Sequence, residues 1–440
     1  MKLERGQLGL LGALAATIPV SIFAAETALA LGVIVFAARL VRKQTRLAAT
    51  PLDAPLLAFA VWTLLSASFA ADPGAAHEDA KELLLFALFY LAVDTLARDV
   101  DRERVLAALL MGGIALATLM VVQYHLLGHD TLNQRPSGFL GHWMSSSGIL
   151  MGVLVTAAAR LAFGARHRVR PRDGWLVGGI VAGVGAVATL GWAGAGVLPT
   201  RLFVAALAAG GAAVALSRPA SLRAATAALP WVALPLTAWA LVVSQTRNAW
   251  IGAILGLTVV AVMRAPRLLW ALAATLAVLL LLRPAAVTSR LTITDRSSID
   301  RYYQGQAGLD MILDKPVFGQ GPGMILTAYP RYRWPEAPNP DTPHLHNNAL
   351  QIAATRGLPC LAFFAWWVLV ALATSLAQAR RAGQGSPGGW PAVAALGGLA
   401  AILFAGVFEY NLGDSEVLML ALLLTSMPFA QRHERAGDGV

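Results

Sequence analysis

The chain has 440 residues, of which 57% are hydrophobic and 13% charged, and its formal net charge is +10. Together with a mean hydropathy of +0.63, this composition excludes an ordinary soluble enzyme and is typical of a polytopic membrane protein. The single cysteine, Cys360, excludes disulfides and multi-cysteine metal sites.

The first predicted spans follow one another from the N-terminus. Apolar runs cover residues 8–24, 28–40, 56–69 and 83–96, and several approach the roughly 20 residues that cross a bilayer. The first run follows Lys2 and Arg5 and resembles a signal peptide. It lacks a small-residue cleavage site before a polar domain and a second span follows directly, so we expect it to be retained.

Basic clusters recur along the chain and define one side of the membrane. They stand at 39–46, 98–104, 166–172, 218–223, 264–267, 380–381 and 432–435. The positive-inside rule makes these loops cytoplasmic, so topology explains the charge and we expect no nucleic-acid partner. The sequence predicts an all-α polytopic membrane protein of about 12–14 transmembrane helices with both termini in the cytoplasm.

Polar segments on the opposite, external side stand at 71–82, 128–148, 244–250, 283–346 and 408–416. The fourth is far longer than an ordinary connection, and such loops usually carry function. We therefore expect three parts: a transmembrane helix bundle of residues 1–282, a large external loop of residues 283–346, and C-terminal transmembrane helices of residues 347–440.

Internal order is evident in the large loop. A helix is expected to begin near Ser297 and to end at Asp314, before Lys315 and Pro316. The glycines of VFGQGPG, residues 317–323, suit a close backbone approach to an anionic group, although the context of a dinucleotide fingerprint is missing.

Two histidines close the loop, His344 and His346. On a helix they would point to different faces, and few carboxylates are near in sequence, so we expect no metal site. Either ring could simply hydrogen-bond to the backbone. A neutral histidine could instead act as a general base that takes a proton from a hydroxyl.

Two arginines lie on the same external side. Arg247 stands between two apolar segments, where a charge needs a partner unless the side chain snorkels to the interface. Arg301 lies in the first turn of the expected loop helix, where it could be merely solvated. Beside a histidine and a glycine-rich turn, however, two arginines suit an anionic lipid diphosphate.

The stretches SQTRNAWIG, DKPVFGQGPG and HLHNNALQIAATRGL resemble the O-antigen ligase and polymerase superfamily of bacterial inner membranes. Its pattern is an arginine, a large periplasmic loop and a histidine-asparagine motif that enters a helix. The resemblance is sharp from Ser244 to Leu358, and the O-antigen ligase fits best.

The ligase resemblance implies a metal-independent, cofactor-free glycosyltransferase in the inner membrane of a Gram-negative bacterium. Its donor would be O antigen linked to undecaprenyl diphosphate and its acceptor a sugar hydroxyl of lipid A-core, both among membrane lipids and at the periplasmic face. His346 would be the general base, and Arg247 and Arg301 would bind the diphosphate. Residues 283–346 would then be a periplasmic catalytic loop.

Further residues are candidates for substrate binding. Arg135 can also be an interfacial belt residue, and Arg331 and Arg333 can also supply rim charge alone. The remaining candidates are His344, Asn347 and Gly321.

Three other functions stay open from the sequence. An O-antigen polymerase or a protein O-oligosaccharyltransferase of the same superfamily differs from the ligase only in the acceptor. A lipid-linked glycan transporter is a different class, suggested by many spans and external arginines.

Overall fold

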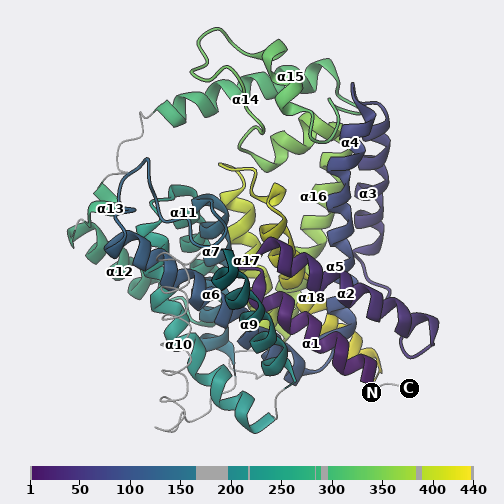
Figure 1. Ribbon diagram of the computed structural model, residues 1–440, viewed down its shortest axis with the longest axis vertical. Coiled ribbons are helices and arrows are strands. Elements are labelled where there is room, and N and C mark those ends of the chain that lie inside the picture. Colours follow the sequence, from purple (N-terminus) through teal and green to yellow (C-terminus); the bar gives the residue numbers. More distant parts are fainter. Residues whose placement is uncertain are drawn as a thin grey trace.

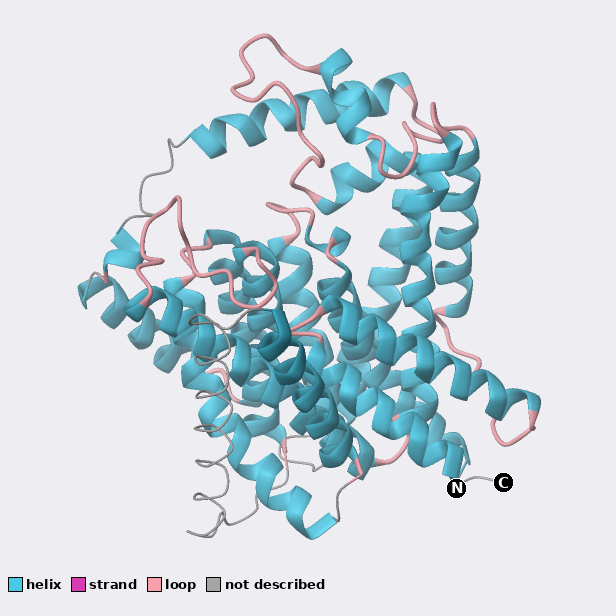
Figure 2. Ribbon diagram, in the orientation of Figure 1, coloured by secondary structure: helices cyan, strands magenta, loops and turns pink. Residues whose placement is uncertain are grey.

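The computed structural model describes residues 2–164, 197–216, 219–282, 284–288, 296–382 and 389–437. It is 78% helical, and no β-strand occurs in these ranges (Figure 2). The predicted all-α class is therefore confirmed. The basic cluster at 166–172 and residues 289–295 of the large loop lie outside the described residues.

Short connections join the described helices. In chain order these are α1 (Lys2–Thr17), α2 (Ile22–Val41), α3 (Asp53–Ser68), α4 (Pro73–Asp79), the 3₁₀ helix η1 (Ala80–Phe86), α5 (Ala87–Thr95), α6 (Asp99–Leu126), α7 (Trp143–Phe163), α9 (Val197–Ala215), α10 (Pro219–Val243), α11 (Arg247–Arg264), α12 (Leu268–Leu282), α13 (Ala285–Thr288), α14 (Arg296–Asp314), α15 (Ile325–Tyr332), α16 (Asn348–Ala382), α17 (Trp390–Ala405), the 3₁₀ helix η2 (Asn411–Gly413) and α18 (Ser415–Gly437).

Six of these helices contain stretches long and apolar enough to cross a membrane, namely α2, α6, α7, α10, α11 and α16. Shorter apolar helices lie in α3, α12, α17 and α18. The chain is thus a multi-pass membrane protein. The total number of spans stays a prediction, because residues 165–196 lie outside the described ranges.

The boundary between the first two apolar helices differs from the one that hydropathy suggests. Helix α1 ends at Thr17 and α2 begins at Ile22, several residues before the expected boundary at 25–27. Pro19 has no N–H to donate to a helix, and Ser21 caps α2 by accepting a hydrogen bond from the N–H of Ala24 at 3.3 Å. Proline and capping chemistry, which hydropathy ignores, set this boundary.

Helices α11 and α17 pack closely through small residues. A Cβ atom on Gly252 of α11 would lie 2.8 Å from the carbonyl oxygen of Ala401, and one on Gly256 would lie 2.9 Å from the α17 backbone. This spacing of four residues lets two membrane helices approach at backbone distance. Because α11 begins at Arg247 and α17 ends just before Glu409, the contact fixes these two residues relative to each other.

Helices α14 and α15 of the large loop form a layer at one end of the molecule (Figure 1). Helix α14 packs against α15 and α16. The two chain ends are marked side by side at the opposite end (Figure 1). The prediction that both termini lie in the cytoplasm stays a prediction.

Candidate functional site

His346 lies in the loop directly before α16, in an unusual backbone conformation. Its φ is +50°, in the left-handed region where residues other than glycine are uncommon. Its Nδ1 lies 2.8 Å and 2.9 Å from the two carboxylate oxygens of Glu409. The carboxylate therefore orients the ring through Nδ1, and Nε2 has no hydrogen-bond partner within the described part of the chain.

The two asparagines that follow the histidine fasten α16 to the loop between α17 and η2. Asn347 caps the helix, because its Oδ1 accepts a hydrogen bond from the N–H of Leu350 at 2.9 Å. Its Nδ2 donates to the carbonyl oxygen of Val407 at 2.9 Å. Asn348 donates from its side-chain amide to Oδ1 of Asn411 at 2.8 Å. These bonds hold the histidine against the segment that carries its carboxylate partner.

Glu409 lies next to three other residues of the site, His346, Arg301 and His344. In the sequence it is noted only as part of the external segment 408–416. It is 5% exposed. Its Oε2 lies 3.3 Å from Nη2 of Arg301, and its Oε1 lies 3.7 Å from Nδ1 of His344. Burial opposes ionisation, but the hydrogen bond from His346 and the nearby positive groups hold the pKa of Glu409 below its usual value.

His344 lies beside His346, with ring centroids 4.3 Å apart. Residues 344–347 are not helical, so the expectation that the two side chains point to different faces is wrong. Burial, together with the charge of His346, lowers the pKa of His344 to about 4, so that its ring is neutral near pH 7.

The ring placement also brings three possible metal ligands together. His344, His346 and Glu409 offer atoms within 4.8 Å of one another. A closed structural zinc site takes four ligands, whereas catalytic sites use three and keep one position open. The metal-free site thus stays a prediction, and it loses the support that helix geometry was expected to give.

Both candidate diphosphate arginines are connected to the start of α14. Arg301 lies in the first turns of this helix, and its buried Nε atom has no partner within the described residues. Nη2 of Arg247 lies 3.4 Å from Oγ of Ser298, one helical turn before Arg301. The structure therefore groups Arg247, Arg301 and the His346–Glu409 pair at one end of α14.

The glycine-rich turn packs against protein backbone. Gly321, with φ of +106°, donates its N–H to the carbonyl oxygen of Thr355 at 2.8 Å. A Cβ atom there would lie 2.3 Å from Cβ of Ala70. The expected close approach is present, but its partner is the chain itself, so the N–H of Gly321 is already used. A role for Gly321 toward substrate stays a prediction.

The other three candidate arginines contact their own surroundings. Arg135 lies over the ring of Trp143 at 4.7 Å, and Arg331 lies over the ring of Tyr332 at 5.5 Å. Arg333 donates to two carbonyl oxygens of its own loop at 2.8 Å and 3.0 Å. These contacts show how the side chains are held, and their roles toward substrate stay predictions.

Fold and site together define a multi-pass, all-helical membrane protein with a histidine, a carboxylate and arginines gathered at one end of its helix bundle. Residues 232–365 match the family described as O-antigen ligase. This match supports the O-antigen ligase superfamily, a superfamily of glycosyltransferase-like enzymes, for this part of the chain. No curated protein matches the chain.

The matched region includes Arg247, Arg301 and His346. Glu409 lies beyond its end, which is a further reason why the linear motif does not reveal this residue. The only sequence signal for Glu409 is a carboxylate in a short external segment between two apolar runs.

Proposed function

We propose that this protein is an O-antigen ligase. It would transfer a glycan from undecaprenyl diphosphate to a sugar hydroxyl of lipid A-core at the periplasmic face of the inner membrane. The observation that carries the proposal is the pairing of His346 with Glu409 beside Arg301, in a chain whose matched region contains both His346 and Arg301.

The proposed reaction uses each of these groups once. With Nδ1 held by Glu409, Nε2 of His346 accepts the proton of the acceptor hydroxyl. The hydroxyl oxygen then forms a bond to the anomeric carbon of the donor. The bond from this carbon to the diphosphate oxygen breaks, and the diphosphate leaves with the electron pair. Attack on the face opposite the leaving group inverts the anomeric centre.

Charge develops at two places in this reaction. Arg301 and Arg247 would neutralise the departing diphosphate, because one guanidinium group can donate two parallel hydrogen bonds to phosphate oxygens. Glu409 would stabilise the positive imidazolium of His346. These side chains supply the charges that a metal ion provides in other glycosyltransferases, which supports a metal-independent reaction.

Two alternatives in the same superfamily share this chemistry. An O-antigen polymerase would use a lipid-linked glycan as acceptor, and a protein O-oligosaccharyltransferase would use a serine or threonine hydroxyl. A transporter is less well supported, because the polar groups gather at one end of the bundle, whereas transporters bind substrate near the membrane midplane.

Complementation tests the choice of acceptor. A Gram-negative strain that lacks its ligase but makes a compatible O antigen would receive this protein, and its lipopolysaccharide would be separated on a gel. We expect the ladder of capped lipopolysaccharide to return. Longer lipid-linked glycans, or a glycosylated secreted protein, without a restored ladder would replace the ligase with one of the two alternatives.

A further inference from the structure

A polar cavity of about 170 Å³ lies next to the carboxylate of Glu409. Its wall is formed by segments distant in sequence. These are the end of α4, η1, the start of α7, parts of the large loop, the first half of α16 and the segment before α18. Its ionisable lining residues include Asp79, Glu82, Arg356, Glu409, Tyr410 and Asp414. None of the first three is among the residues to which the resemblance gives a role.

The groups in this cavity are buried but not fully satisfied. Arg356 is 5% exposed, its Nη2 lies 3.7 Å from Oδ2 of Asp79, and its Nε has no hydrogen-bond partner among the described residues. Burial raises the pKa of Glu82 to about 7 and raises the pKa of Asp79. Near pH 7 the Glu82 carboxyl can be protonated or ionised, so together with a guanidinium that has a spare N–H it can both donate and accept hydrogen bonds. A sugar ring presents hydroxyls that need both.

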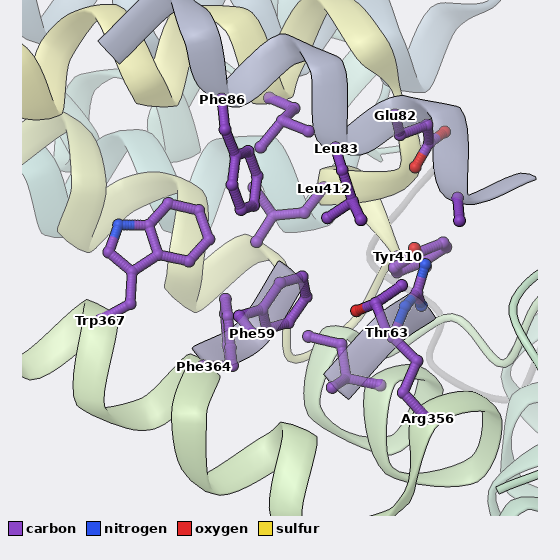
Figure 3. Close-up of a pocket in the computed structure, with 13 residues that line it drawn as sticks. Phe59, Thr63, Glu82, Leu83, Phe86, Arg356, Phe364, Trp367, Tyr410 and Leu412 are labelled. Carbon is purple, nitrogen blue, oxygen red and sulfur yellow. The ribbon is translucent and has the colours of Figure 1, made fainter. Parts of the chain in front are cut away.

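Size and shape restrict what this cavity can hold. Its volume lies below the about 300–1,000 Å³ of pockets for drug-sized ligands, so one sugar ring suits it better than a glycan chain. Figure 3 shows Glu82, Arg356 and Tyr410 at one end of a neighbouring pocket, whose other end is closed by aromatic rings. Phe86 and Trp367 belong to this aromatic wall, with ring centroids 5.5 Å apart.

The cavity also lies on a distinct side of the site. His344 and Glu409 line it, whereas His346 and Arg301, which both approach Glu409, do not. Its lining carries four carboxyl groups and one arginine, a composition that suits a diphosphate less well than the arginines near His346 do. The cavity is nevertheless close to the proposed base. His344 lines the cavity, and its ring centroid lies 4.3 Å from that of His346.

We infer that this cavity, which Arg247 and Arg301 do not line, is the acceptor subsite and holds one unphosphorylated sugar residue of the acceptor next to Glu409. The inference rests on the proposed function and deepens it. Asp79, Glu82 and Arg356 would then determine acceptor specificity without taking part in the bond exchange.

Steady-state kinetics of the purified full-length protein test this inference. Transfer is measured with an undecaprenyl-diphosphate-linked glycan and rough lipopolysaccharide, varying one substrate at a time. The variants are Glu82→Gln and Asp79→Asn, which keep the side-chain shape. The matched control is Glu78→Gln, because Glu78 stands on the same external segment but does not line the cavity. Wild-type protein is also offered acceptors with and without a phosphate on the terminal sugar.

We expect each cavity variant to raise the KM for the acceptor about tenfold, the effect of losing one hydrogen bond to a charged group. The KM for the donor should stay within about twofold, and Glu78→Gln should behave as wild type. Phosphorylation of the terminal sugar should abolish transfer.

Two different failures are separable. If wild-type protein transfers glycan but neither variant changes the KM for the acceptor, or the terminally phosphorylated acceptor is used equally well, the cavity is not the acceptor subsite. If wild-type protein transfers nothing to lipopolysaccharide, the proposed function itself fails. Should a variant not fold, the phosphorylated acceptor still decides the question with wild-type protein.

Discussion

Glu409 holds the imidazole of His346 by Nδ1 and is itself shielded from water. Replacing it by glutamine removes the negative charge that would stabilise the imidazolium. We expect Glu409→Gln to lower kcat by about 10²-fold or more, because loss of the carboxylate in a comparable histidine–carboxylate pair costs up to about 10⁴-fold. Donor KM should change little. Initial rates of the purified variant provide the measurement.

The exposed Glu336 of the large loop provides a control for Glu409, since Glu336→Gln removes the same charge from another part of the large loop region. Equal kcat values for Glu409→Gln and Glu336→Gln would show that the carboxylate next to His346 has no part in the reaction.

His344 predicts a pH dependence of stability. Its folded pKa is about 4, below the ordinary 6.5, so the unfolded chain binds a proton more readily between these values. The free energy of unfolding should therefore fall as pH drops from 6.5 toward 4. We expect His344→Gln to flatten this decline when Tm is followed in detergent. Parallel curves for the two proteins would contradict the burial of a neutral His344.

At the residue scale, the sequence can predict His346 but not its partner. A histidine-asparagine pair before an apolar helix is a local pattern, whereas Glu409 is 63 residues away. Only the folding of α16 against the loop after α17 brings the two together. The contact between His344 and His346 was unpredictable for a related reason, since helical spacing rules do not apply to an irregular segment.

At the scale of elements, a kink in α16 packs against the glycine-rich turn. Gly357 has φ of +82°, and a Cβ atom there would lie 1.9 Å from the carbonyl oxygen of Val317. We expect Gly357→Ala to destabilise the protein by more than about 1 kcal/mol, because both the backbone conformation and the contact become strained. Thermal unfolding in detergent, with transfer activity measured in parallel, checks this.

Gly305 in α14 is the matched control for Gly357. A Cβ atom at Gly305 meets nothing within 4 Å. Gly305→Ala should therefore leave the free energy of unfolding unchanged or raise it by up to about 1 kcal/mol, because alanine has the higher helix propensity, and Tm should not fall. If Gly357→Ala is as stable as Gly305→Ala, the kink does not depend on glycine.

The helix boundaries that could be predicted from the sequence are those set by a local feature such as a proline. The loop helix α14 ends at Asp314 as expected, because a proline follows closely. Hydropathy misplaced the junction of α1 and α2, since both flanks are equally apolar. Hydropathy also gives a single apolar run, 83–96, where the structure has two elements, the end of η1 followed by α5. Hydrophobicity does not distinguish a 3₁₀ helix from an α-helix.

At the scale of the whole molecule, α14, which carries Arg301, and α1 lie toward opposite ends of the molecule (Figure 1). From the positive-inside rule we expect the site to lie outside the cytoplasm. In a Cys360→Ala background, we expect Asp341→Cys in the large loop to react with a membrane-impermeant maleimide in spheroplasts. Lys43→Cys, after α2, should react only after lysis. Both positions are exposed. The reverse pattern would invert the topology.

The overall class was predictable because composition alone requires a membrane environment for a chain this apolar. The packing of its helices was not, since apolar periodicity carries little information where every helix face is apolar. The close contact of α11 with α17 depends on the small residues Gly252 and Gly256. Their spacing is visible in the sequence, but the partner helix is not.

We propose that His346 is the base of a metal-independent glycan transfer, and its replacement tests this directly. Purified wild-type protein and His346→Ala would be compared in transfer from an undecaprenyl-diphosphate-linked glycan to rough lipopolysaccharide, with and without EDTA. The exposed His77, replaced by alanine, serves as control. We predict that His346→Ala lowers kcat about 10²- to 10⁴-fold, with donor KM nearly unchanged and wild-type activity unaffected by EDTA. If His346→Ala has the same kcat as the wild-type protein, His346 is not the base. If EDTA abolishes the activity of the wild-type protein, the reaction is not metal-independent.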